Sequence, residues 1–201
     1  MKVKVFFALL LLAVASTQAS AQLIWWDAPS YFSPKPMDDI GLYVSRSTSV
    51  DEATGLSGIW RQSGNVNLGV RAGIGDLNDA GGTVLVGAEL YGPLNSLLPG
   101  TAVDISWILG AGAVFGSRHT LFSVPVGASF GLQLGSGGVQ ILPYVYPRVS
   151  LDITAVEFNG REETDMQAGF AVDLGADVSL GERFILRVGG SLIDREAFGV
   201  G

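Results

Sequence analysis

The sequence predicts an all-β protein built from antiparallel strands that are joined up-and-down. In one segment after another every second residue is apolar, and this period of two indicates an extended strand with one apolar face. The clearest examples are residues 66–74, 122–132 and 170–178, and the apolar set of each contains no charged residue. We find no helical apolar period of convincing length, so strands are expected throughout.

Ten segments are expected to be strands, and turn-forming sequences separate them. Tight turns rich in the residues that turns require occur at 63–65, 135–138 and 180–182, whereas 47–55 and 154–166 are long and polar. Short connections at one end and long ones at the other are typical of outer-membrane barrels. The expected strands are 39–46, 56–62, 66–75, 83–91, 102–115, 120–133, 139–153, 167–179, 183–193 and a stub at 197–201.

The first 21 residues have the features of an export signal. Lys2 and Lys4 form the positive start, residues 6–14 form a short apolar run, and 19–21 form a small-residue cleavage site. The apolar run is too short to span a bilayer as a helix. We therefore expect residues 1–21 to be a cleaved signal peptide.

Two further regions are expected after the signal. Residues 22–38 are rich in proline and aromatic residues, and we expect an irregular segment that lies against the membrane interface or the barrel mouth. Residues 39–201 are expected to form one β-barrel domain.

The composition argues against several classes of partner. The formal charge is −7, and loss of Lys2 and Lys4 makes it −9 (−7 − 2), which disfavours a nucleic acid or an anionic surface bound by charge. Cysteine is absent, so disulfides do not hold the fold together. Beyond the signal Lys35 is the only lysine, whereas a soluble sheet protein normally carries lysine on its solvent face and edges.

The apolar strand faces could point towards a protein core or towards lipid. Ten strands supply about forty apolar side chains, whereas a small closed barrel holds about three layers of four side chains in its interior. A two-sheet sandwich could accommodate them, so a soluble periplasmic β-sandwich or a lipocalin-like binding protein stays as an alternative. We favour lipid, and hence a closed antiparallel up-and-down transmembrane β-barrel of eight to ten strands, because unpaired strand edges cannot sit in lipid.

The opposite face would then fill the barrel interior with small residues and paired charges. Symmetric pairing across the loop 76–82 places Arg71 opposite Gly87, with Glu89 diagonal to it. Pairing about residues 179–183 places Arg187 opposite Gly175, with Asp173 and Asp177 as diagonal neighbours. Arginines between carboxylates, with glycine beside them, are typical of enclosed charges that have partners.

Large residues should also face small ones. Pairing about residues 135–138 places Tyr144 opposite Ser129 and Tyr146 opposite Gly127. If the connection 92–101 pairs its flanking strands symmetrically, the carboxylates of Glu89 and Asp104 lie close together and perturb each other. The predicted interior polar network, with a role in packing, charge balance and ion selectivity, is Arg71, Glu89, Asp104, Tyr144, Tyr146, Arg148, Asp173, Asp177 and Arg187.

These features together resemble the small outer-membrane β-barrel proteins of the OmpA/OmpX-like kind, over residues 39–201. The resemblance implies location in the bacterial outer membrane, outer-membrane lipids as partners, and delivery by the outer-membrane assembly machinery. Such barrels usually end in a full strand that closes on an aromatic residue, and the ending Ala197–Gly201 departs from that pattern.

Catalytic and metal-binding patterns are weak. His119 is the only histidine, beside Ser117 and near Ser123, so a membrane-embedded lipid hydrolase is a second alternative, but no acid is placed to orient it. Residues 76–81 begin like a calcium loop, but its fifth and twelfth positions do not fit. The acidic segment 155–165 is expected to be a solvated loop. We predict no cofactor, no metal, no protein partner and no enzymatic activity, and expect a structural envelope role or a narrow pore for small solutes.

Overall fold

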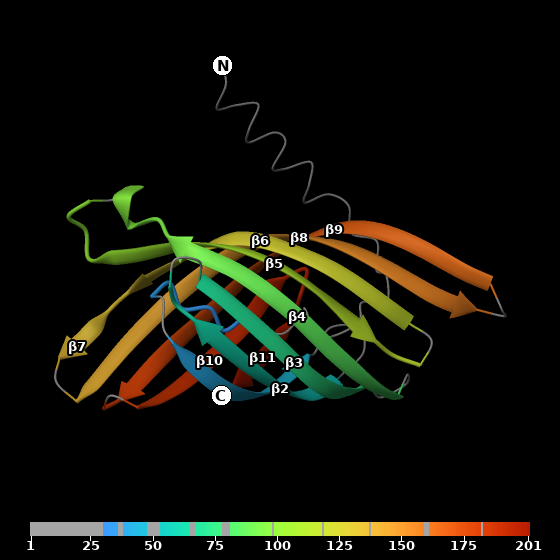
Figure 1. Ribbon diagram of the computed structural model, residues 1–201, viewed down its shortest axis with the longest axis horizontal. Coiled ribbons are helices and arrows are strands. Elements are labelled where there is room, and N and C mark those ends of the chain that lie inside the picture. The colour runs from blue at the N-terminus through green and yellow to red at the C-terminus, as the bar shows by residue number, and fades with distance from the viewer. Residues whose placement is uncertain are drawn as a thin grey trace, which may run out of the picture.

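The chain forms a closed antiparallel β-barrel of ten strands (Figure 1). The computed structural model describes residues 30–35, 38–47, 53–64, 67–77, 81–97, 99–117, 119–136, 138–158, 161–181 and 183–201. The elements are β1 (Asp39–Ser47), β2 (Ala53–Gln62), β3 (Asn67–Leu77), β4 (Gly81–Pro93), the 3₁₀ turn η1 (Asn95–Leu97), β5 (Val103–Phe115), β6 (His119–Leu132), β7 (Leu134–Ser136), β8 (Val139–Phe158), β9 (Arg161–Leu180), β10 (Phe184–Ile193) and β11 (Ala197–Val200).

Each strand pairs with the next one along the chain, and the first and last strands close the ring. β1 pairs with β2 on one side and with β11 on the other. β6 and the short β7 both pair with β8, so they act as one strand interrupted at Gln133. All ten predicted strands are confirmed, and the predicted fold class is confirmed as an up-and-down barrel. No helix in these described ranges is long and apolar enough to cross a membrane.

We call the end of the barrel where β1 begins the base and the opposite end the rim. At the base β2, β4, β7 and β9 end and β3, β5, β8 and β10 begin. At the rim β1, β3, β5, β8 and β10 end and β2, β4, β6, β9 and β11 begin, so the hairpin of β8 and β9 points towards the rim. The barrel is tallest at this hairpin, which extends beyond its neighbours at the right of Figure 1.

The prediction of a long polar loop over 154–166 is wrong. β8 and β9 instead continue as a paired ladder as far as Phe158 and Arg161. β6 pairs with the other side of β8 up to Val156. Residues 153–156 include the β-branched Ile153, Thr154 and Val156, and pairing on both edges outweighs the polarity of the segment.

Two predicted registers are wrong by two residues. Tyr144 pairs with Gly131 rather than Ser129, because the turn is centred on residues 137–138 and not on 135–138. Arg187 pairs with Asp177 rather than Gly175. A shift of two residues keeps every side chain on its predicted face. The third register is confirmed, since Arg71 pairs with Gly87.

Candidate functional site: a barrel interior filled by its own chain

Residues 30–35 run through the barrel interior before the chain enters β1. The side chains of Ser30 to Pro34 are buried, whereas Lys35 reaches the base and donates to Gln133 Oε1 at 3.1 Å. We call residues 30–34 the plug. We expected residues 22–38 to lie against the membrane interface or the barrel mouth, and this expectation is wrong for residues 30–34, which are buried in the interior. Residues 22–29, 36 and 37 lie outside the described residues.

Inward-facing side chains satisfy the irregular backbone of the plug. The Ser30 amide donates to Asp173 Oδ2 at 2.8 Å. The Ser30 carbonyl accepts from Arg61 Nη2 at 3.1 Å and from Arg71 Nη2 at 3.2 Å. Buried backbone groups outside a ladder need such partners, so these polar side chains make an irregular segment possible in the interior.

Serine hydroxyls hold the second half of the plug. Ser129 Oγ donates to the Phe32 carbonyl at 2.8 Å. Ser106 Oγ donates to the Pro34 carbonyl at 2.5 Å. Ser106 is on β5 and Ser129 is on β6. The other partners, Arg61, Arg71 and Asp173, are on three further strands, so hydrogen bonds hold the plug from several sides of the wall.

Aromatic rings fill the space between plug and wall. Tyr31 stacks on Tyr43 with ring centroids 4.4 Å apart. Phe32 packs edge-on against Tyr91 at 4.9 Å, and Arg61 lies over the Phe32 ring at 5.1 Å. Glycine is required at Gly199, since a Cβ there would overlap the Tyr31 hydroxyl.

Glu89 joins two arginines inside the barrel. Its carboxylate accepts from Arg61 Nε at 2.9 Å and from Arg71 Nη2 at 2.5 Å. The side chains of Arg61, Arg71 and Glu89 are at most 5% exposed. The same two arginines hold the Ser30 carbonyl, so this cluster connects the charge balance of the barrel to the position of the plug.

Asp173 is the second buried carboxylate centre. Its Oδ1 accepts from Arg148 Nη2 at 3.2 Å and from Ser191 Oγ at 2.7 Å, while Oδ2 accepts from the Ser30 amide. The predicted diagonal contact of Asp173 with Arg187 is replaced by this Arg148 pair, because the β9–β10 register differs by two residues.

The third cluster lies towards the base and joins β10 to β1. Arg187 Nε donates to Asp177 Oδ1 at 2.8 Å. Its Nη2 lies 3.0 Å from Asp39 Oδ2, and its Nη1 donates to the Tyr43 hydroxyl at 2.8 Å. One guanidinium thus bridges three strands, since Asp177 is on β9 and the other two partners are on β1.

A fourth cluster lies towards the rim. Arg195, from the turn between β10 and β11, is 1% exposed, pairs with Asp152 and donates to Ser150 Oγ at 2.6 Å. Ser123 Oγ donates to Asp152 Oδ1 at 2.5 Å. The four clusters together contain five arginines and five carboxylates, so the described interior is formally neutral (5 − 5 = 0).

Eight of the nine predicted network residues are buried in the interior, namely Arg71, Glu89, Tyr144, Tyr146, Arg148, Asp173, Asp177 and Arg187. The ninth, Asp104, lies at the base, where its Oδ1 accepts from Asn95 Nδ2 at 3.2 Å in an exposed position. The predicted closeness of Glu89 and Asp104 is wrong, because Glu89 pairs with Gly110, six residues along β5.

Four members of these clusters were not predicted from the sequence, namely Arg61, Asp39, Asp152 and Arg195. Arg61 and Asp152 are at inward-facing positions of the alternation in their strands, so their place in the interior could have been predicted from that alternation. Arg195 is in a turn, where no periodicity indicates that its side chain enters the barrel.

The other sequence candidates lie in strands of the wall or outside the described residues. His119 starts β6 and pairs with Val156 in the wall. Residues 155–158 and 161–165 belong to the β8–β9 ladder, and residues 78–80 of the calcium-like segment lie outside the described residues. Within the described ranges, no group of His, Asp or Glu could hold a metal ion.

Asp38 fixes the chain where it leaves the plug and enters β1. The Ser63 amide and hydroxyl both donate to Asp38 Oδ1, at 2.5 and 2.7 Å. These hydrogen bonds lower the pKa of the Asp38 carboxyl, so the contact is present at neutral pH and is lost as the pH falls through that lowered pKa.

A small cavity lies beside the plug in the described part of the interior. The cavity lined by Phe32, Ser33, Tyr91 and Arg187, among others, has a volume of about 10 Å³, which is about one water molecule. The described part of the interior thus contains the plug, its aromatic contacts and the paired charges of the four clusters.

No protein-family model matches this chain, and no curated protein matches it. The structure therefore supports the resemblance to OmpA/OmpX-like proteins only in that the closed barrel is compatible with a small barrel fold.

Proposed function

We propose that this protein is an integral β-barrel of the bacterial outer membrane, closed to solutes by its plug, with a structural role in the cell envelope. The main support for this proposal is the apolar surface that the outer face of the barrel wall exposes. In the described part of the chain, 33 large apolar side chains are exposed. A soluble monomer rarely exposes contiguous apolar surface on this scale, whereas lipid covers such a surface.

The height of the apolar surface fits a membrane. On β6 the outward residues from Phe122 to Leu132 cover ten steps along the strand. At about 3.4 Å per residue and a strand tilt of about 40°, this distance is roughly 26 Å along the barrel axis. The apolar band of outer-membrane barrels is about 25 Å tall.

Exposed aromatic residues occur towards both ends of this band. Trp60, Trp107 and Phe184 lie near the base ends of their strands. Phe115 and Phe122 lie near the rim, with ring centroids 6.4 Å apart. Aromatic girdles at both membrane–water interfaces are typical of transmembrane barrels.

The interior argues against the lipocalin-like alternative. A soluble barrel that binds an apolar ligand needs an apolar lumen and a polar outer face. Here the lumen contains five arginines and five carboxylates, and the outer face is apolar. The same observations argue against the narrow pore, because the plug and the ion pairs occupy the lumen.

Cell fractionation with heat-modifiable gel mobility tests the location. We expect the protein in the outer-membrane fraction, with an unheated band that migrates differently from the heated one. Recovery in the soluble periplasm, with no heat-dependent shift, would overturn the proposal. Planar-bilayer recording then tests the closed state: we expect no conductance steps from the folded protein, and regular steps would assign a pore instead.

A further inference from the structure

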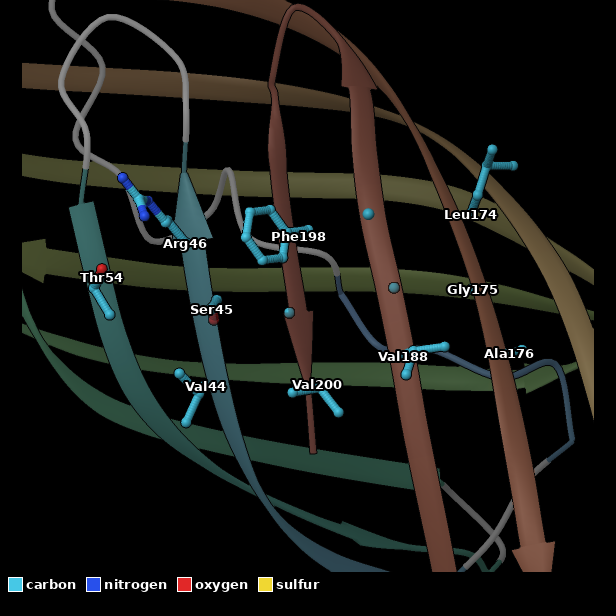
Figure 2. Close-up of a pocket in the computed structure, with 13 residues that line it drawn as sticks. Val44, Ser45, Arg46, Thr54, Leu174, Gly175, Ala176, Val188, Phe198 and Val200 are labelled. Atoms are coloured by element: carbon cyan, nitrogen blue, oxygen red, sulfur yellow. The ribbon is translucent and has the colours of Figure 1, made fainter.

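The rim half of β9 has a strand neighbour on one side only. β8 pairs with β9 over the whole of Arg161–Leu180, whereas β10 pairs with it only over 171–180. Figure 2 shows this lower part, where Ala176 of β9 lies beside Val188 of β10. Above it, no strand in the described part of the chain pairs with the second edge of residues 161–169. We call this second edge of residues 161–169 the free edge.

The free edge arises because the chain turns away from β9 at the end of β10. β10 ends at Ile193, which has a φ of 84°, and β11 begins at Ala197. A positive φ is rare for a β-branched residue, so the backbone turns sharply here. Asp194 makes the last contact with β9, since its amide donates to the Phe170 carbonyl at 3.3 Å and its Oδ2 accepts from the Phe170 amide at 2.8 Å. The β8–β9 hairpin continues past this point, at the right of Figure 1.

The contact between Phe170 and this turn shows which backbone groups point to the free edge. The amide and the carbonyl of Phe170 both face the turn, on the β10 side of β9. In an antiparallel ladder both groups of a residue point to the same side, and the side alternates along the strand. The amides and carbonyls of Ala168, Met166 and Thr164 therefore point to the free edge. The Met166 amide donates to the carboxylate of its own neighbour, Asp165 Oδ1, at 2.9 Å, as expected of an amide outside a ladder.

The described charged side chains beside the free edge are acidic. Glu163 and Asp165 are exposed on the inner side of the hairpin, and Asp194 and Glu196 are exposed in the turn below it. Arg195 of the same turn is buried inside the barrel. The surface next to the free edge therefore favours a positively charged occupant.

The same charges disfavour pairing of two copies of the chain through the free edge. Antiparallel pairing centred on residue 163, 164 or 165 places a carboxylate opposite a carboxylate in each case, which destabilises the pair. A metal ion is also a poor occupant, because it would leave the backbone groups of the edge unbonded, and no group of acidic residues in the described ranges could hold one. Lysine and proline, which protect many strand edges, are absent from 161–169.

We infer that the free edge accepts an extended segment of a partner polypeptide in which basic and apolar residues alternate. The segment would lie in line with β10, antiparallel to β9, and exchange backbone hydrogen bonds with β9. Its basic side chains would lie opposite Glu163 and Asp165 on the inner side. Its apolar side chains would lie opposite Ala168 and Met166 on the outer side, where Met166 is 64% exposed. This inference goes beyond the proposed structural role, and it uses only the contacts of the hairpin and of the adjacent turn.

Disulfide capture of a synthetic peptide tests this inference, because the chain has no cysteine of its own. The probe is a short peptide of alternating valine and lysine, with the central valine replaced by cysteine. The acceptor is Met166→Cys in the full chain, and the matched control is Ile153→Cys, the β8 residue that pairs with Met166 and has strands on both sides. Opposed residues on paired strands lie close enough for a disulfide. Vesicles of a zwitterionic lipid hold the protein, so that the lysines do not bind to the membrane.

We expect capture at Met166→Cys to exceed capture at Ile153→Cys by about tenfold or more, because only β9 has an edge that the peptide can join. Replacing the remaining valines of the peptide by proline should abolish capture, since the amides at these positions would face β9. The double variant Glu163→Gln with Asp165→Asn should reduce capture by about threefold or more, because it removes the opposing charges. A β-type circular dichroism spectrum of each variant confirms that it is folded before capture is measured.

Other outcomes would overturn the inference. Equal capture at Ile153→Cys, or capture that survives proline, would indicate adsorption of the peptide without strand pairing. Equal capture of a valine–glutamate peptide would show that the acidic residues do not select the partner. Disulfide-linked dimers of Met166→Cys without peptide would assign the free edge to a second copy. No capture by the folded protein would reject the strand acceptor and leave the proposed function, which cell fractionation tests separately, intact.

Discussion

The substitution Glu89→Gln tests whether the interior ion pairs hold the barrel together. Glutamine has the same shape but no charge, so Arg61 and Arg71 would lose their shared carboxylate while staying buried. Removing one partner of a buried ion pair typically costs about 3–5 kcal/mol, because the remaining charge is left uncompensated. Both Glu89 contacts are 2.9 Å or shorter with little solvent access, so we expect a loss in this range.

The assay is urea unfolding of the protein reconstituted in lipid vesicles. Asp104→Asn is the matched control, since this carboxylate is at the base with an exposed contact, and its loss should change the free energy of unfolding by less than about 1 kcal/mol. The double variant Glu89→Gln with Arg71→Met should recover part of the loss, because it restores a neutral interior. A change below about 1 kcal/mol for Glu89→Gln would show that these buried ion pairs do not hold the barrel together.

Three further predictions concern the lipid face, the plug and the closed lumen. Val126→Arg, in the middle of the outward face of β6, should lower the free energy of unfolding in vesicles by about 2–4 kcal/mol. Thr164→Arg, an exposed position on the rim hairpin, should change it little. Equal effects of the two substitutions would contradict an outward face of β6 that is covered by lipid. Gly199→Ala should lower the free energy of unfolding by about 1–3 kcal/mol, because its Cβ would overlap the Tyr31 hydroxyl. Adding Tyr31→Phe should recover part of this loss. If the effects of the two substitutions on the free energy of unfolding are strictly additive, the two residues do not touch. Replacing Tyr31 and Phe32 together by glycine should produce small conductance steps in planar bilayers where the wild type is silent, and a silent variant would show that the rings do not close the lumen.

The sequence predicted the strands and their faces because both follow from a local alternation. All ten segments have the expected type, and Arg71, Asp173 and Asp177 are on the expected side of the wall. The registers between neighbouring strands were harder to predict, since each register depends on the residues at which the turn is centred. Turns centred one residue away from the expected position shifted Tyr144 and Arg187 by two positions without changing their faces.

The plug could not be predicted from periodicity. Residues 30–34 contain aromatic residues, serine and proline without any alternation, and nothing local indicates that they enter the barrel. Their position depends on partners far along the chain, such as Asp173, which is 143 residues away from Ser30. Arg195 was missed for the same reason, because a turn residue finds its partner Asp152 only in the closed barrel.

A single-cysteine scan of β6 in lipid vesicles tests whether the outward face of the barrel wall lies in lipid. Each residue from Phe122 to Leu132 would be replaced in turn, labelled with a fluorophore and exposed to a quencher confined to the bilayer; the absence of native cysteine makes each label unique. We expect protection at the inward-facing residues and quenching at the outward-facing ones, namely Phe122, Val124, Val126, Ala128, Phe130 and Leu132. Quenching with no period of two, or none at any position, would contradict an outward face that lies in lipid.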